Sequence, residues 1–136
     1  KIYEYVVDTR EKQDVFTRKY CYHYTRVLDI EKMKRAAVLL IGKHDFSAFT
    51  DKKDEKSKIR ELYSVKIEKH GQKIHFCFYG NGFMYHQVRI LTGTLLEVGT
   101  GERSVESVGE ALRTKERAKA GFLVPALALT LKKVEY

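Results

Sequence analysis

Residues 73–101, KIHFCFYGNGFMYHQVRILTGTLLEVGTG, change from one hydrophobic period to another within a single stretch. Ile74, Phe76 and Phe78 alternate with other residues, which is typical of a strand with one buried face. After Phe83 the spacing of large apolar residues becomes four and three, and one line of a helical wheel carries Met84, Val88, Leu91, Leu95 and Val98. The stretch therefore predicts a strand that leads into a long helix packed on the sheet.

The residues just before this stretch predict the other half of a β-hairpin. Tyr63, Val65 and Ile67 alternate, and we expect them to share the buried face of a strand. His70, Gly71 and Gln72 supply the turn between the two strands. Residues 50–58, TDKKDEKSK, have almost no apolar content and predict an exposed loop.

The N-terminal part predicts two strands and a helix. Residues 1–8 and 19–26 are rich in aromatic and β-branched residues, which favour strands. Asp29 is suited to cap an amphipathic helix that ends at Gly42. Residues 44–49, HDFSAF, are interpreted as a loop anchored by its two phenylalanines.

The C-terminal part predicts a second, shorter helix and a last strand. Ser104 is suited to cap a helix that runs to about Leu112, and residues 126–136, ALALTLKKVEY, favour a strand. The predicted order is β-β-α-β-β-α-α-β. This order indicates one α+β domain over residues 1–136, with a mostly antiparallel sheet and helices packed on one face.

Composition narrows the classes of function. Lys and Arg number 26 against 18 Asp and Glu, so the net charge of +8 suits either a polyanionic partner or an ordinary solvated surface. Two distant cysteines favour a reducing, cytoplasmic setting, and no stretch is long and apolar enough to span a membrane. The chain has no zinc-ligand spacing, phosphate-binding loop or hydrolase motif, so it contains no complete catalytic set.

Two residues in the region of the long helix are candidates for a functional role. On the helical wheel Arg89 lies away from the apolar line but remains among large side chains. Its guanidinium either extends to water over apolar surface or is held to pair with a carboxylate or phosphate. His86, beside the start of the helix, is interpreted as a surface or RNA-facing residue more readily than as a general base.

Four stretches in the same order resemble the second half of the TruA family of tRNA pseudouridine synthases. They are KIYEYVV at the start, LDIEKMKRAAVLLIGKHDFSAFT, GNGFMYHQVRILTGTLLEVGTG, and AGFLVPALALTLKKVEY at the end. The resemblance runs nearly from end to end, and it implies a ferredoxin-like half of a pseudouridine synthase. It further implies an isomerase that converts uridine to pseudouridine in the tRNA anticodon stem-loop without a metal or an organic cofactor.

The resemblance also assigns expected roles to residues. Arg89 matches an arginine that forms a salt bridge with the catalytic aspartate, and Tyr3 matches a tyrosine near the flipped uracil. Leu129 matches an apolar residue that lines the base pocket, although Ala128 stands where the family often has glycine. The motif that carries the aspartate is absent, so we expect the aspartate on a missing N-terminal domain and this chain alone to be inactive. The family is homodimeric, which implies a homodimer here.

Basic residues near the exposed loop are candidates for tRNA contacts. Lys58 and Arg60 follow a run of lysines and could lie along a phosphate backbone without reading sequence. Because acidic residues interleave with this run, a solvated surface explains it equally well. The alternatives to an enzyme are a dimerising structural domain, or a non-catalytic RNA-binding module that stacks bases on Tyr20, Tyr22 and Tyr24.

Overall fold

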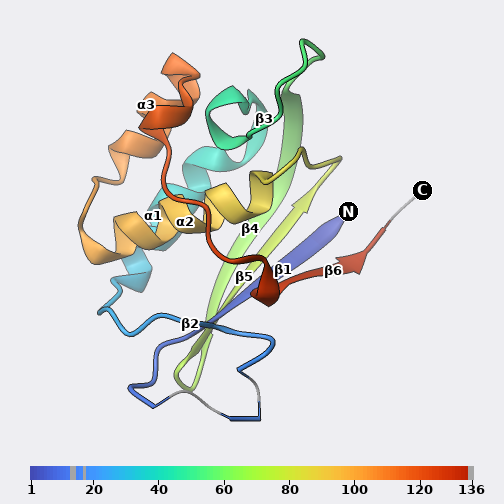
Figure 1. Cartoon of the computed structure of the whole chain (residues 1–136). Helices are drawn as coiled ribbons and strands as arrows, with labels where there is room; N and C mark the ends of the chain where they lie inside the picture. The colour runs from blue at the N-terminus through green and yellow to red at the C-terminus, as the bar shows by residue number, and fades with distance from the viewer. Residues whose placement is uncertain (13–14, 17, 135–136) are drawn as a thin grey trace.

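A computed structural model describes residues 1–12, 15–16 and 18–134 of the chain. Strands run over β1 (Ile2–Asp8), β2 (Tyr22–His23), β3 (Gly42–Asp45), β4 (Ile59–His70), β5 (Lys73–Gly80) and β6 (Leu129–Lys133). Helices run over α1 (Ile30–Leu40), α2 (Gln87–Thr100) and α3 (Glu106–Thr114), and short 3₁₀ helices over η1 (Ser47–Phe49), η2 (Arg117–Lys119) and η3 (Ala126–Ala128). The predicted α+β class is confirmed (Figure 1).

The sheet is mixed and built around β1. The strand order is β2-β1-β5-β4-β3, and β6 also pairs with β1, along its first half. The short β1–β2 pairing is parallel and all other pairings are antiparallel. Because β1 lies near the start of the sequence and β6 near its end, their pairing places residues more than 120 positions apart side by side (Figure 1).

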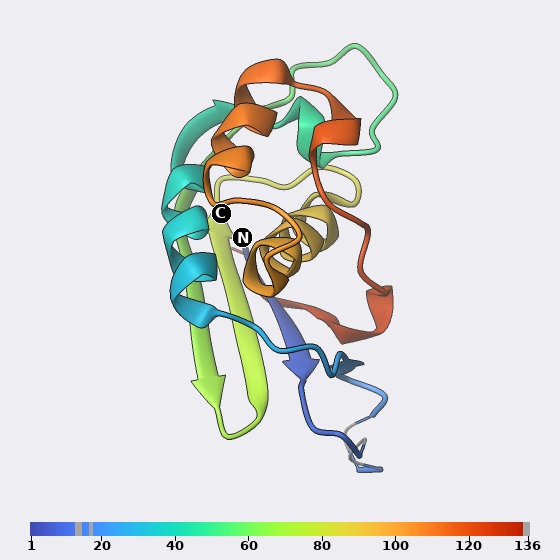
Figure 2. The same cartoon turned by 90° about the vertical axis from the view of Figure 1, so that its left-hand side faces the viewer.

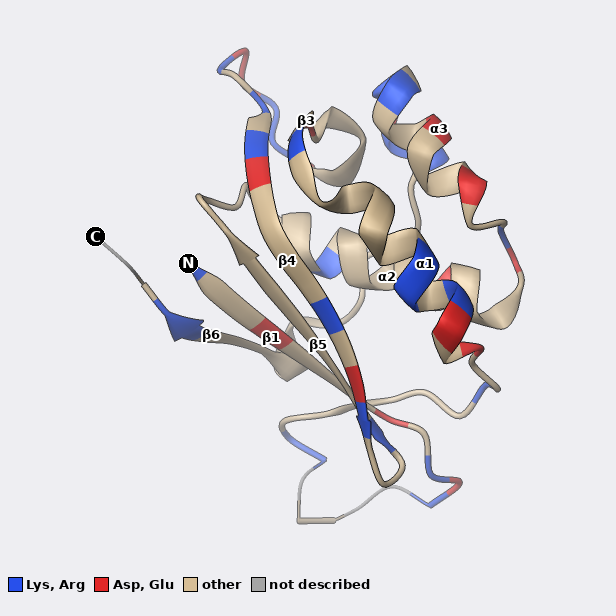
Figure 3. Cartoon of the chain, turned by 180° about the vertical axis from the view of Figure 1, so that it is seen from behind, with Lys and Arg blue, Asp and Glu red and all other residues tan. Residues whose placement is uncertain are grey.

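The core lies between the helices and one face of this sheet. Alternate residues of β5 are buried, including Ile74, Phe76 and Phe78 as predicted. Every residue of the predicted apolar line of α2 is buried too, from Met84 to Val98. The opposite face of the sheet carries Glu4 and His75, which lie 3.3 Å apart (Oε2 to Nδ1). Along the strands, β4 carries charged residues of both signs and β6 carries basic residues only (Figure 3).

Helix boundaries follow the predicted caps. The Asp29 carboxylate accepts a hydrogen bond from the Lys32 N–H at 3.1 Å, which satisfies one free donor at the start of α1. That helix ends at Leu40, and Gly42 adopts a φ of 109° as the chain turns into β3. The Ser104 hydroxyl accepts from the Ser107 N–H at 3.2 Å, just before α3.

Several strand predictions need correction. The strand predicted over residues 19–26 shrinks to Tyr22–His23. Residues 42–45, predicted as a helix end and part of a loop, form β3 against β4. A register shift between Leu62 and Ser64 turns the side chain of Tyr63 out of the core, so Tyr63 is 46% exposed and Leu62 is buried in its place.

The tyrosines of the proposed stacking module do not form one exposed row. Tyr22 packs edge to face on Tyr5, at 6.5 Å between ring centroids, and Tyr24 stacks on Phe122 at 6.5 Å. Both tyrosines thus cover the core edge, while Tyr20 alone is largely exposed. This arrangement removes the geometric basis of the RNA-recognition-motif hypothesis.

Two absences apply to the described part of the chain. None of its helices is long and apolar enough to cross a membrane. Within the same residues, no cluster of three or more His, Cys, Asp or Glu side chains could hold a metal ion. The last two residues of the predicted final strand, 135–136, lie outside the described residues.

Candidate functional site

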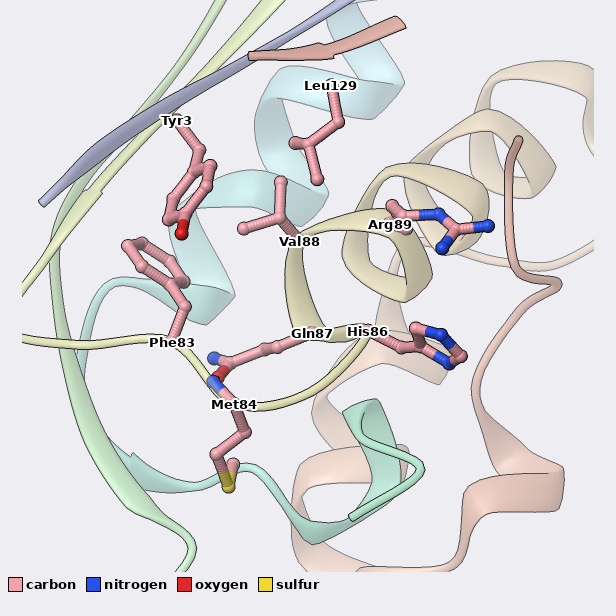
Figure 4. Close-up of a pocket in the computed structure, with 8 residues that line it drawn as sticks. All are labelled: Tyr3, Phe83, Met84, His86, Gln87, Val88, Arg89 and Leu129. Carbon is pink, nitrogen blue, oxygen red and sulfur yellow. The ribbon is translucent and has the colours of Figure 1, made fainter. Parts of the chain in front are cut away.

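A pocket lies where the first turn of α2 meets the paired ends of β1 and β6. Its volume is about 180 Å³. It is lined by Tyr3, Phe83, Met84, His86, Gln87, Val88, Arg89 and Leu129. Figure 4 shows Tyr3 and Phe83 facing each other on one side of the helix start, and His86 and Arg89 on the other. The structure thus gathers four of the six predicted site residues around one hollow.

Strand pairing explains why Tyr3 and Leu129 meet there. In the β1–β6 ladder Tyr3 lies opposite Leu131, and Tyr5 lies opposite Leu129. Tyr3 is half-buried and packs edge to face on Phe83, with ring centroids 5.3 Å apart at 85°. This wall of the pocket is therefore aromatic, which suits contact with a planar ring.

Arg89 is half-buried and held at only one of its nitrogen atoms. Its Nε donates to the backbone carbonyl of Val124 at 2.8 Å. Within the described residues, its two terminal nitrogens have no hydrogen-bond partner, and no carboxylate lies within ion-pair distance of it. The guanidinium therefore keeps a fork of donors available for an anion.

The segment that carries Val124 is packed directly on α2 (Figure 2). The Gly121 N–H donates to the Thr94 hydroxyl at 2.8 Å, and the Phe122 N–H donates to the Glu97 carboxylate at 3.1 Å. A Cβ added at Gly93 would lie only 1.8 Å from the Phe122 carbonyl oxygen. Glycine at this helical position therefore allows the close approach that brings Val124 to Arg89.

Tyr5 supports this segment from the side of the sheet. Its hydroxyl donates to the Pro125 carbonyl at 2.6 Å, and its ring is fully buried. Burial raises the pKa of Tyr5 well above its usual range, while the positive charge of Arg89 acts in the opposite direction. The tyrosine therefore stays neutral and keeps its hydrogen bond.

His86 is held by an acidic residue that the sequence analysis placed in a solvated charge run. The His86 Nδ1 lies 2.7 Å from Asp51 Oδ2, and the Arg117 Nε donates to Asp51 Oδ1 at 3.0 Å. The hydrogen bond from His86, together with that from Arg117, holds the pKa of Asp51 below its usual value. His86 itself adopts a φ of 64°, a left-handed conformation that is uncommon for a residue with a side chain.

Sequence reasoning missed this network because its members are distant in the chain. Asp51 is 35 residues from His86 and 66 from Arg117. One signal could have found Asp51: it is the first acidic residue after the well-defined HDFSAFT stretch, and so lies next to an anchored segment rather than in the open loop.

Gln87, another lining residue, contributes an unusual buried amide. It is 0% exposed, and its Oε1 accepts from the Met84 N–H at 2.9 Å. Its Nε2 has no acceptor within the described residues, which costs about 1–3 kcal/mol. A polar ligand with a free oxygen would remove that cost.

The two basic candidates, Arg60 and Lys58, lie outside the pocket. The Lys58 Nζ donates to the Asp54 carbonyl at 2.7 Å, within the exposed loop. Arg60 donates from one terminal nitrogen to the carbonyls of Ser57 and Ile59. Its chain passes beside Gly82, where an added Cβ would lie 3.6 Å from the Arg60 Nε. Arg60 therefore borders the loop that enters the pocket at Phe83, whereas Lys58 lies farther along.

The site combines an aromatic wall with an available guanidinium and the N-terminus of a helix. Free backbone donors at a helix start favour an anion, as does Arg89. This chain offers no carboxylate among the residues that line the pocket, so it can orient and stabilise a reacting group but supplies no acidic nucleophile there.

Comparisons with known proteins agree with this geometry. A family model described as tRNA pseudouridine synthase matches residues 36–136. The tRNA pseudouridine synthase A of Geobacillus sp. (strain WCH70) is 44% identical over 137 residues, which cover 100% of this chain and 55% of that protein. The proteins of the same name from Clostridium kluyveri and Halalkalibacterium halodurans are 46% and 45% identical, covering 56% and 49% of their lengths. The chain thus spans about half the length of the curated relatives it matches.

Proposed function

Because the chain belongs to the tRNA pseudouridine synthase family, we propose that the whole protein isomerises uridine to pseudouridine in the anticodon stem-loop of tRNA. The observation that carries the proposal is the state of Arg89. Its guanidinium is half-buried at a pocket, is held by one backbone carbonyl, and lacks an acidic partner within the described residues. Such a group is prepared for a carboxylate supplied from elsewhere.

We propose that this carboxylate is an aspartate of the other half of the protein. Placed within hydrogen-bonding distance, the Arg89 charge would lower the pKa of that aspartate and keep it ionised. Only the ionised form can act as a nucleophile in the cleavage of the bond between the base and the ribose. The uracil then turns and rejoins the ribose through C5, so the reaction is an isomerisation that needs no co-reactant. This half alone is expected to be inactive.

Tyr3 and Leu129 are proposed to receive the base. The enzyme must take its target uridine out of the stack, and the extruded ring needs a pocket. The edge-to-face pair of Tyr3 and Phe83 offers an aromatic wall, and Leu129 is proposed to close the pocket against water. The Tyr3 hydroxyl adds a donor or acceptor for the proton that leaves C5.

The surroundings of the pocket are proposed to bind the tRNA backbone. Arg60 borders the loop that leads into the pocket, and the chain has a net charge of +8. Lys58, in the exposed loop, and His86, which lines the pocket, are proposed as further contacts. Such contacts hold the register of the RNA without reading its sequence. We also propose that the whole protein works as a homodimer in the cytoplasm, which rests on the family resemblance and on two cysteines that are free.

The proposal is tested with the full-length protein and tRNA labelled with tritium at C5 of uridine. Wild type should release tritium and form pseudouridine. Arg89→Ala should lower kcat/KM by at least 100-fold, about 2.7 kcal/mol of barrier, and Arg89→Lys should recover part of it. Arg113→Ala, which removes an exposed arginine of α3, serves as the matched control and should stay within threefold of wild type.

Two outcomes would count against the proposal in different ways. A wild-type protein that forms no pseudouridine in any tRNA would overturn the function itself. A wild type that is active, with Arg89→Ala within threefold of it, would remove Arg89 from the site.

A further inference from the structure

Tyr85 is a large aromatic residue that the fold leaves in solvent beside the pocket. It is 63% exposed. Its ring stacks on His86, with centroids 3.6 Å apart at an interplanar angle of 26°. Because His86 lines the pocket, stacking on it places the Tyr85 ring next to the pocket's rim. Within the described residues, the Tyr85 side chain has no aromatic partner other than His86, so its outer face is open.

Contacts to both Tyr85 and His86 hold the stacked pair in place. The Tyr85 carbonyl accepts from the Thr50 hydroxyl at 2.7 Å and from the Asp51 N–H at 3.4 Å. The His86 ring lies against the Asp51 carboxylate, which Arg117 holds on its other oxygen. Arg117 is anchored in turn, because one of its terminal nitrogens donates to the Gly121 carbonyl at 2.8 Å.

Backbone conformation adds to this evidence. His86 keeps a φ of 64°, a conformation that few residues with a side chain adopt. The contacts of the pair with Asp51 and Thr50 hold the backbone at this position. An exposed ring on such a fixed support loses little conformational freedom when a second ring stacks on it.

A flipped uridine leaves its neighbours in the RNA with one stacking partner fewer. A nucleobase has a π-face whatever its identity, so an aromatic ring at the rim can replace the lost partner without reading sequence. We propose that Tyr85, supported by His86, stacks on the nucleobase next to the target uridine. This inference rests on the proposed function, because it assumes that the pocket receives the uridine.

The test uses the full-length protein and an anticodon stem-loop in which one base flanking the target uridine is replaced by an abasic site. Each flanking position is tested separately. For wild type, one of the two replacements should raise KM about tenfold and leave kcat within threefold. Tyr85→Leu should raise KM about tenfold on the intact RNA, with no further rise on that abasic RNA.

Conservative and control variants separate stacking from folding. Tyr85→Phe and Tyr85→Trp keep a ring and should stay within threefold of wild type. Tyr20→Leu removes a tyrosine that is 69% exposed and outside the pocket, and should change nothing. If Tyr85→Leu is less stable than wild type, the variants Tyr85→Phe, Tyr85→Trp and Tyr85→His are compared on the same abasic RNAs. That comparison still reports whether KM depends on the size of the ring at position 85.

The inference is overturned if the effects of Tyr85→Leu and of both abasic replacements multiply independently, or if Tyr85→Leu leaves KM unchanged. These results are distinct from failure of the proposed function, in which wild type itself forms no pseudouridine.

Discussion

Substitution of Gly93 by alanine should test the close packing of residues 121–124 on α2, which holds the Val124 carbonyl against Arg89. Gly93 lies inside α2, where alanine would ordinarily stabilise the helix. In this fold, however, the added Cβ would lie 1.8 Å from the carbonyl oxygen of Phe122. Ordinary contact begins at about 3.4 Å, so the segment from Gly121 to Val124 would have to move by about 1.6 Å.

The loss of unfolding free energy caused by that movement can be estimated from the contacts that it strains. Overpacking of a well-packed site costs about 1–3 kcal/mol. The Gly121–Thr94 and Phe122–Glu97 hydrogen bonds would lengthen beyond useful range, at about 1 kcal/mol each. We expect a loss of about 3–5 kcal/mol in the free energy of unfolding, which would lower the Tm by about 10 °C or more.

The assay is thermal and urea unfolding followed by circular dichroism, with Gly109→Ala as the matched control. Gly109 lies in α3, where an added Cβ would meet only the Leu39 Cδ1 at 4.0 Å. This control should raise stability by about 0.5–1 kcal/mol. If Gly93→Ala were as stable as wild type, the close packing of residues 121–124 on α2 would be wrong.

Three further predictions concern charge and hydrogen bonding. The hydrogen bond from His86 lowers the folded-state pKa of Asp51, so the ionised carboxylate stabilises the fold above the unfolded pKa of about 3.9. This contribution disappears as the pH falls through the lower folded-state pKa. In urea unfolding, the loss of unfolding free energy caused by Asp51→Asn should therefore be full at pH 7 and smaller at pH 3. Arg60→Gln should weaken tRNA binding and reduce the slope of log K against log salt by about 0.7–0.9, and an unchanged slope would place Arg60 off the RNA. Tyr5→Phe should cost about 1–3 kcal/mol in urea unfolding, because it leaves the Pro125 carbonyl without its donor, and a smaller effect would mean that water replaces the hydroxyl.

Local pattern was sufficient where burial follows a regular period. The β4–β5 hairpin and the apolar line of α2 were predicted because each places one kind of side chain on one face. The same reasoning failed at Tyr63, since one extra residue in β4 reverses the faces and no residue type marks it. It also failed at residues 19–26, where alternating tyrosines pack on the core edge with only two residues in a ladder.

The roles of the candidate site residues could be predicted only from the resemblance of the sequence to a family. Spacing alone left Arg89 with two interpretations, because the carbonyl that holds it belongs to Val124, 35 residues away. The structure adds that the guanidinium is half-buried and that its terminal nitrogens are unoccupied within the described chain, which is the basis of the anion-binding role that we propose. The position of Asp51 beside the anchored HDFSAFT stretch was a signal in the sequence, but its pairing with His86 and Arg117 was not, because those partners come from segments that only the folded chain brings together.

A crystal structure of the full-length protein would test the central claim most directly, through the distance between the terminal nitrogens of Arg89 and the nearest carboxylate oxygen. We expect an aspartate from the other half of the protein within about 3 Å of those nitrogens, the range of a charge-assisted hydrogen bond. An Arg89 side chain that points into solvent, or one that pairs with an acidic residue of residues 1–136, would contradict the account.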